Sequence, residues 1–272
     1  MKALIRQLGA GLALLTSLLP APAFAGFQVL GSLSREARLS PGEHMDGRIL
    51  VQNTGQEVIE LEAYQTDYWF ASDGTNRYDD AGSLPRSNAK WIHVAPQQLR
   101  VPAGETLSFS YTVDVPADAD LVGSYWSMLM VAPITQPVAP EGRPGERHVS
   151  VQTVMRYGLQ LITEVGQGAG SIKVLSAGLA EGDGGVRMDL ELENVGTRHV
   201  RPRVWLEIFD TTGAAIGRWE GESKRLYPTT SARIAIPLTG LPAGQYTDLM
   251  VADLGNDEVF GAQYNLDLKQ TP

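Results

Sequence analysis

Apolar and polar side chains alternate along His148–Ile162 for about twice the length of an ordinary strand. The odd positions are apolar apart from one threonine: Val149, Val151, Thr153, Met155, Tyr157, Leu159 and Leu161. A period of two predicts a β-strand with one apolar side. Such a long strand exceeds what one small domain needs. We therefore expect Tyr157–Leu161 to pack in the chain's own core and the earlier residues to pack in a groove on a partner. The alternative is that all seven odd positions face the chain's own core.

The remainder of the chain after residue 25 shows short alternating runs separated by Gly, Pro, Asn and Asp, with almost nothing that predicts a helix. The clearest runs are residues 48–55, 58–70, 106–116, 123–131, 186–196, 200–210, 231–238 and 244–253. Short strands at this spacing are typical of antiparallel sandwiches. The sequence therefore predicts an all-β protein of two tandem immunoglobulin-like sandwiches.

The two halves of the chain repeat the same short motifs in the same order. The matching pairs are 53–55 with 194–196 (NTG and NVG), 70–74 with 209–213, and Tyr125 with Tyr246. We expect Asn and Gly in the first pair to take positive φ in tight turns. Each tyrosine resembles the tyrosine corner of immunoglobulin-like domains. With a glycine-rich joint near Val165–Gly170, these repeats predict domains at 26–165 and 170–272.

The first 25 residues have the pattern of a cleaved secretory signal, with a membrane anchor as the alternative. Lys2 and Arg6 precede an apolar stretch too short to span a membrane comfortably, and Ala23-Phe24-Ala25 is a cleavage signal. No later stretch is long and apolar enough to span a membrane. The full sequence carries a net charge of −9 and no cysteine. Secretion without cysteines favours a bacterial periplasm, and acidity without a basic run argues against nucleic acid.

The sequence holds no motif that predicts an enzyme, a cofactor or a metal site. The four histidines, His44, His93, His148 and His199, lack ligand spacing and are expected to be solvated or capping residues. Residues 73–80 are rich in oxygen ligands but favour a polar hairpin over a calcium loop. There is no G-x-S-x-G motif and no cysteine nucleophile. The five tryptophans leave open a sugar-binding platform, although Trp126 and Trp205 are expected to pack in or near the cores.

Several short motifs resemble the periplasmic pilus chaperones of the chaperone–usher pathway. In the first half these are Leu99–Gly104, Val115-Pro116 and Leu121–Pro133, followed by the Pro-rich stretch Ile134–Arg147 and the long alternating strand. In the second half they are Leu192-Glu193-Asn194 and Leu226-Tyr227-Pro228. The resemblance covers most of the mature chain. It implies a two-domain protein in the periplasm of a Gram-negative bacterium.

The resemblance also implies a function and a set of site residues. The chain would cap an incomplete pilus or surface-protein subunit by lending it the long strand, with Val149, Val151 and Met155 in the subunit's groove. An outer-membrane usher would be a further partner. An arginine at Arg35 or Arg38 would hold the subunit's terminal carboxylate. The family's lysine position falls near Gly158, which leaves Arg156 as the only basic residue of that strand.

A rival prediction comes from a different class of protein, an immunoglobulin-like structural or adhesion module that binds glycan or cell wall. A chaperone should leave the edge of its long strand accessible and some apolar side chains uncovered. A module should cover that strand within its own sheet and expose an aromatic patch elsewhere.

Overall fold

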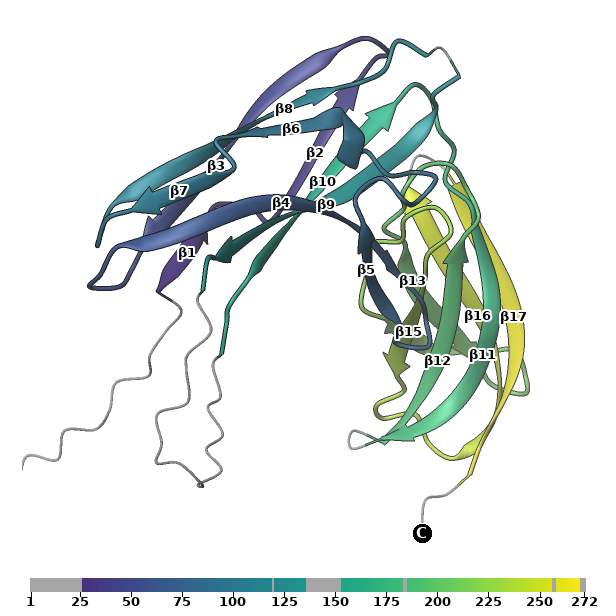
Figure 1. Cartoon of the computed structure of the whole chain (residues 1–272). Coiled ribbons are helices and arrows are strands. Elements are labelled where there is room, and N and C mark those ends of the chain that lie inside the picture. Colours follow the sequence, from purple (N-terminus) through teal and green to yellow (C-terminus); the bar gives the residue numbers. More distant parts are fainter. Residues whose placement is uncertain (1–25, 119, 136–152, 183–184, 256–257, 270–272) are drawn as a thin grey trace, which may run out of the picture.

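A computed structural model describes residues 26–118, 120–135, 153–182, 185–255 and 258–269. The predicted signal segment and two of the residues predicted to bind a partner, Val149 and Val151, lie outside this range. Nearly all regular structure is β-strand, and the described helix is a single 3-10 turn, η1 (Ala89–Trp91). No helix among these residues is long and apolar enough to cross a membrane. The predicted fold class, two tandem immunoglobulin-like sandwiches, is confirmed (Figure 1).

The first sandwich consists of β1–β10. One sheet has the order β1 (Phe27–Leu30), β3 (His44–Asn53), β8 (Thr106–Asp114), β6 (Ile92–Ala95). The other has the order β2 (Ser34–Leu39), β10 (Tyr157–Val165), β9 (Gly123–Pro133), β4 (Ile59–Phe70), β5 (Asn76–Asp80), and β7 (Gln98–Val101) also pairs with β4. Apolar residues of alternating positions meet between the sheets, where Ile49, Phe109, Leu129 and Leu159 are fully buried.

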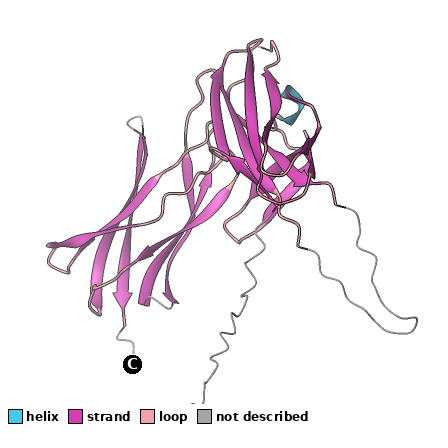
Figure 2. Cartoon of the chain, turned by 90° about the vertical axis from the view of Figure 1, so that its left-hand side faces the viewer, coloured by secondary structure: helices cyan, strands magenta, loops and turns pink. Residues whose placement is uncertain are grey.

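The second sandwich consists of β11–β17. One sheet has the order β11 (Ile172–Gly182), β12 (Gly185–Asn194), β15 (Ser231–Pro237). The other has the order β14 (Ala215–Glu220), β13 (Arg203–Phe209), β16 (Gly244–Gly255), β17 (Glu258–Leu268). Its core includes Leu190, Leu206, Ile234 and Met250, which have no exposed surface. The two sandwiches meet at an angle, which gives the chain a bent outline (Figures 1 and 2).

The long strand is shorter than predicted at its start. β10 begins at Tyr157, and residues 153–156 are described but belong to no strand. The neighbouring strand β9 ends at Pro133, which has no N–H to continue the ladder. At the other end β10 runs to Val165, three residues beyond the predicted end. The eight shorter predicted runs all contain strands.

The repeated Asn motifs form the same turn in both halves. Asn53 is buried, and its side-chain Nδ2 donates to the carbonyls of Glu57 and Val101 while its Oδ1 accepts from the N–H of Gly55. Asn194 is also buried and makes the equivalent bonds, with Oδ1 accepting from Gly196. The expectation of positive φ here is wrong, since none of these residues has it. A buried amide that satisfies the turn's backbone groups explains the asparagine instead.

A second expectation about the repeat holds for one tyrosine only. The Tyr246 hydroxyl donates to the carbonyl of Pro242, four residues upstream, as in a tyrosine corner. Tyr125 instead packs its ring against Trp91, with centroids 4.6 Å apart. The two sandwiches are therefore related in plan but differ at this position.

Candidate functional site

The outer edge of β10 is covered by β2 over only part of its length. β2 pairs with β10 in parallel from Ser34/Gln160 to Leu39/Val165, and the Gln160 N–H donates to the carbonyl of Leu33 at 2.8 Å. Before Ser34 the chain crosses to the other sheet, where β1 pairs with β3. Among the described residues no strand pairs with this edge at 157–159. We call this segment the open edge.

Apolar side chains flank the open edge on both sides. Leu159 and Leu161 are buried in the first core and Tyr157 packs against it, as predicted. Upstream, Met155 is 49% exposed, and Leu33, whose carbonyl accepts from Gln160, is 42% exposed. The alternative that all odd positions lie in the chain's own core is wrong for Thr153 and Met155, which are both exposed.

A small aromatic core joins the two sandwiches beside this edge. Trp126 of β9 stacks on Tyr227 of the second sandwich, with ring centroids 4.6 Å apart and planes 10° from parallel. Ile162 of β10 and Phe70 of β4 pack on the same pair. An aromatic pair of this kind contributes about 0.5–1.5 kcal/mol beyond the burial of its area. The angle between the sandwiches is therefore fixed by packing as well as by the linker.

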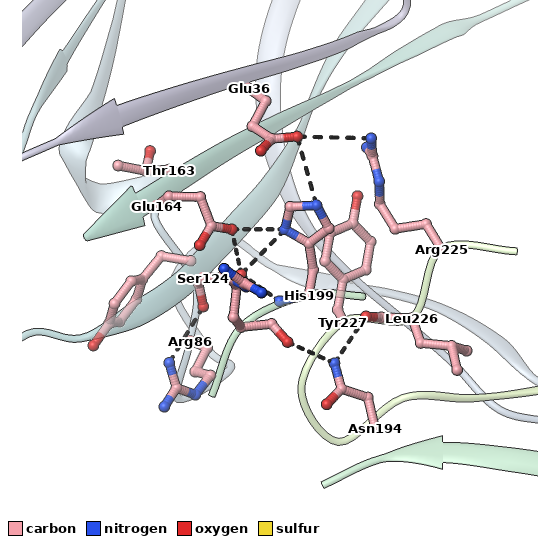
Figure 3. Close-up of polar contacts among 12 residues, drawn as sticks. Glu36, Arg86, Ser124, Thr163, Glu164, Asn194, His199, Arg225, Leu226 and Tyr227 are labelled. Carbon is pink, nitrogen blue, oxygen red and sulfur yellow. Dashed lines mark hydrogen bonds and ion pairs between the residues drawn. The ribbon is translucent and has the colours of Figure 1, made fainter. Parts of the chain in front are cut away.

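A polar bridge lies next to the aromatic core (Figure 3). The ring Nδ1 of His199 lies 2.6 Å from Glu164 Oε1 on β10, and Nε2 lies 3.5 Å from Glu36 Oε2 on β2. The Ser124 hydroxyl donates to Glu164 and accepts from the His199 N–H. Burial alone would raise the pKa of Glu164. The hydrogen bonds from His199 and Ser124, with nearby positive charge, outweigh burial and hold that pKa below its usual 4.5.

Glu36, Glu164 and His199 have potential metal-ligand atoms within 4.8 Å of one another, which raises the question of a metal ion. The two carboxylates face opposite nitrogens of the imidazole ring, Glu164 at Nδ1 and Glu36 at Nε2. One ion binds only one nitrogen of a ring, so it could not take all three residues as direct ligands in this arrangement. The geometry is that of a hydrogen-bonded bridge between β2, β10 and the second sandwich.

Two further side chains of the second sandwich reach β2 and β10. Arg225 Nη1 donates to Ser34 Oγ at 2.6 Å, and Arg225 Nη2 lies 3.8 Å from Glu36 Oε2. The Tyr227 hydroxyl donates to Gln160 Oε1 at 2.9 Å. Burial raises the pKa of Tyr227 to about 12, so the hydroxyl keeps its proton in any physiological buffer.

A cavity of about 560 Å³ opens between the sandwiches beside these contacts. The first sandwich contributes Ser34, Gln160, Tyr68 and the β4–β5 turn to its lining. The second contributes four cationic side chains and one acid: Arg201, Lys224, Arg225, Arg233 and Glu222. Glu191 neutralises Arg233 at 2.8 Å, while Arg201 is exposed. In a chain of net charge −9 this is a local concentration of positive charge, suited to an anionic group.

The arginines predicted from the sequence lie elsewhere. Arg35 is at one of the positions of β2 that face the first core. Burial raises the pKa of Tyr111 in that core, and the nearby charge of Arg35 partly offsets this rise. Arg38 and Arg156 are exposed. None of the three is among the described residues that line the cavity. Over Gly158, the space for a side chain is taken by Met128, whose methyl group would lie 2.5 Å from an added Cβ.

The histidine prediction needs one correction. His44 and His93 are exposed on strands of the first sandwich, and His148 lies outside the described residues. His199, however, is neither a solvated nor a simple capping residue, because its ring bridges two carboxylates at the junction of the sandwiches. The residues 36, 164 and 199 are too far apart in sequence for ligand spacing to reveal this cluster.

The other candidate chemistry has ordinary structural roles. In the 73–80 segment, Asp73 Oδ1 accepts from the Thr75 N–H at 2.8 Å and Asp79 pairs with Arg77, so the acids serve the β4–β5 hairpin. All five tryptophans are at least partly buried. Trp69 Nε1 donates to the Thr229 carbonyl, and Trp219 Nε1 to that of Thr239. They form no exposed platform for a sugar.

Sequence reasoning missed the residues of the second sandwich that build the site. Arg225 and Ser34 are 191 positions apart, and Tyr227 and Gln160 are 67 apart. The one available signal was local, since Lys224 and Arg225 stand directly before the Leu226-Tyr227-Pro228 turn in an otherwise acidic chain.

Comparison with known proteins gives structural likeness only. No protein-family model matches the chain, and no curated protein matches its sequence. A structure from work on a chaperone–tip adhesin complex in CFA/I fimbriae biogenesis is 12% identical, with a TM-score of 0.49 over 89% of this chain and 98% of that one. The class 5 fimbriae chaperone CfaA is 12% identical, with a TM-score of 0.47 over 87% and 98%.

The third comparison is the CsuC–CsuE chaperone–tip adhesion subunit complex of Acinetobacter baumannii. It is 15% identical, with a TM-score of 0.43 over 87% of this chain and 98% of that one. All three resemble this chain over nearly their whole length.

Proposed function

We propose that this chain is a periplasmic assembly chaperone for fimbrial or similar secreted surface subunits. It binds a subunit by adding the edge of β10, with the residues before it, to the subunit's incomplete sheet, and delivers the subunit for assembly. The observation that carries this proposal is the open edge, where the outward side of β10 at 157–159 has no partner strand among the described residues and lies near exposed Leu33 and Met155. Such an edge is a template for another strand.

Strand addition explains the chemistry of the open edge. An extended segment of a partner satisfies the unpaired N–H and C=O groups, and alternate side chains of the donor fill the partner's apolar groove. Since Leu159 and Leu161 are already in the first core, the residues left to serve a partner are those upstream, Met155 and the predicted Val149 and Val151. This division gives the long alternating pattern two roles.

The cationic cavity supplies a place for a negatively charged end of the partner. We assign the carboxylate anchor to the second sandwich, in place of Arg35, Arg38 and Arg156. Its cations are Arg201 and Lys224, which line the cavity and form no ion pair among the described residues, although Lys224 Nζ also donates to the Arg233 carbonyl at 3.0 Å. Guanidinium and ammonium groups form charge-assisted hydrogen bonds with carboxylates. The cavity is bordered by Ser34 and Gln160, so an anchored end would lie beside the start of the open edge.

The rival module is less favoured by the same observations. A module that uses this strand only for itself would cover the edge at 157–159, and no described strand does so. The tryptophans have internal partners. Binding without catalysis, residence in the periplasm and delivery to an outer-membrane usher belong to the proposal and follow from the sequence resemblance.

Co-purification of the tagged mature chain from its native periplasm tests the function. We expect a stoichiometric surface subunit, and recovery of only glycan or cell wall would favour the rival.

A chain with Arg201→Ala and Lys224→Ala should retain about three- to tenfold less subunit, because charged hydrogen bonds are lost. Arg48→Ala with Lys173→Ala removes two exposed cations that do not line the cavity and should leave the yield unchanged. Equal yields from both pairs would remove the anchor from the proposal.

A further inference from the structure

We propose that the second sandwich staples β2 to β10, so that Arg225, Tyr227 and His199 set the point at which the open edge begins. This inference rests on the proposed function only in its use of that edge as the partner site. Ser34 and Gln160 are the first residue pair of the β2–β10 ladder. Arg225 donates a hydrogen bond to the side chain of Ser34, and Tyr227 donates one to the side chain of Gln160.

A third contact ties the same two strands further along. His199 faces Glu36 on β2 with one ring nitrogen and Glu164 on β10 with the other. The three side chains come from a single domain and hold both partners of one strand pair. These three side chains together contact both β2 and β10, whereas an ordinary contact between domains can involve a single strand.

The β2–β10 ladder is the place in the described chain where such support matters. It is the one parallel pairing among the described strands, and it joins only six residue pairs at the edge of its sheet. Parallel ladders are slightly less stable per residue than antiparallel ladders, and edges open first. Just before the ladder, Gly31 has φ +90, and the chain leaves for the other sheet. An unsupported ladder would therefore fray from Ser34.

Fraying would change what the chain offers to a partner. The Gln160 N–H, which now donates to Leu33, would become free, and the open edge would lengthen toward Ile162. A one-residue change of register in a strand turns its side chains to the opposite face. A fixed start of the open edge thus fixes which side chains enter a partner's groove. Arg225, Tyr227 and His199 are positioning residues in this sense.

Hydrogen exchange on the free mature chain tests the staple. Tyr227→Phe removes the hydroxyl that donates to Gln160 and keeps the ring that stacks on Trp126. We expect the Gln160 amide to exchange about fivefold faster, and faster still when Arg225→Lys is added, since each lost bond is worth a few-fold in the opening equilibrium. The Leu161 amide points to β9 and should be unchanged. Tyr246→Phe, which removes the hydroxyl bonded to Pro242, is the matched control.

Each result decides the inference. Unchanged exchange at Gln160 in the double variant overturns it, and so does a rise of equal size at Phe109 in the opposite sheet, which would mean general loosening. A rise confined to the β2–β10 ladder supports it. Because no partner is present, the result is independent of the proposed function. If the wild-type chain retains no subunit while the variants show the faster exchange at Gln160, the staple stands and the chaperone role is wrong.

Discussion

A mature chain with Val149→Asp and Val151→Asp will fold like the wild type and lose its subunit. These residues have the same parity as Met155, whose side chain is 49% exposed and therefore free of the chain's own core. Burial of each valine in a groove contributes roughly 1.5–3 kcal/mol. An unpaired carboxylate in an apolar groove is strongly unfavourable. Together these terms weaken binding by at least about a hundredfold.

The measurement is subunit retention alongside the melting temperature of the free protein. Ser150→Asp with Gln152→Asp is the control, because it adds the same two charges at positions of opposite parity. This control should keep most of the binding. If the valine variant unfolds when isolated, these positions belong to the chain's own core, and strand donation by them is wrong.

Replacement of Asp248 by Asn will stabilise the protein at neutral pH. Asp248 is fully buried in β16, and no side chain among the described residues hydrogen-bonds its carboxylate, which lies near only the backbone N–H groups of Asp248 and Tyr264. Burial raises its pKa from 3.8 to about 6. A folded-state pKa above the unfolded value means that the group's stability is complete below 3.8 and is lost as the pH rises through 6. At pH 7.5 the buried charge therefore costs about 1–3 kcal/mol.

Urea denaturation at pH 7.5 and at pH 4 measures this effect. Asp248→Asn should raise the unfolding free energy at pH 7.5, and most of that gain should vanish at pH 4. Asp253→Asn on the same strand gives the opposite sign. Hydrogen bonding from Gly255 and then Arg203 lowers the pKa of Asp253, so its charge stabilises the fold above the unfolded pKa. An equal gain for Asp248→Asn at both pH values would show that its ionisation is not the cause.

The sequence predicts the elements whose two faces see different surroundings. Runs such as β12 and β16 alternate because one side meets a core and the other meets water. The Asn53 and Asn194 turns are visible because their bonds are local. β2 was missed because its outward residues Ser34 and Glu36 meet the second sandwich, so polar residues occupy a half-covered face and the alternation disappears.

The site was predictable only where one strand carries it. The open edge follows from the pattern of β10 itself. The cationic cavity and the polar bridge depend on side chains brought together by the angle between the sandwiches, and no pattern along the chain encodes that angle. For the same reason the sequence leaves Arg35 and Arg38 as alternatives for the carboxylate anchor and does not reveal that strand parity turns Arg35 toward the first core.

The parallel pairing of β2 with β10 also limits the order in which the parts of the molecule can fold. Most pairings of the second sandwich join sequence neighbours, as in β11 with β12, β13 with β14 and β16 with β17. β2 must instead wait until nearly all of the first sandwich is available, because its partner is the last strand of that unit. Pairings between distant segments are the slow ones. His199, Arg225 and Tyr227 come later still in the sequence, so the binding edge takes its finished form only after the strands of the second sandwich are available as well.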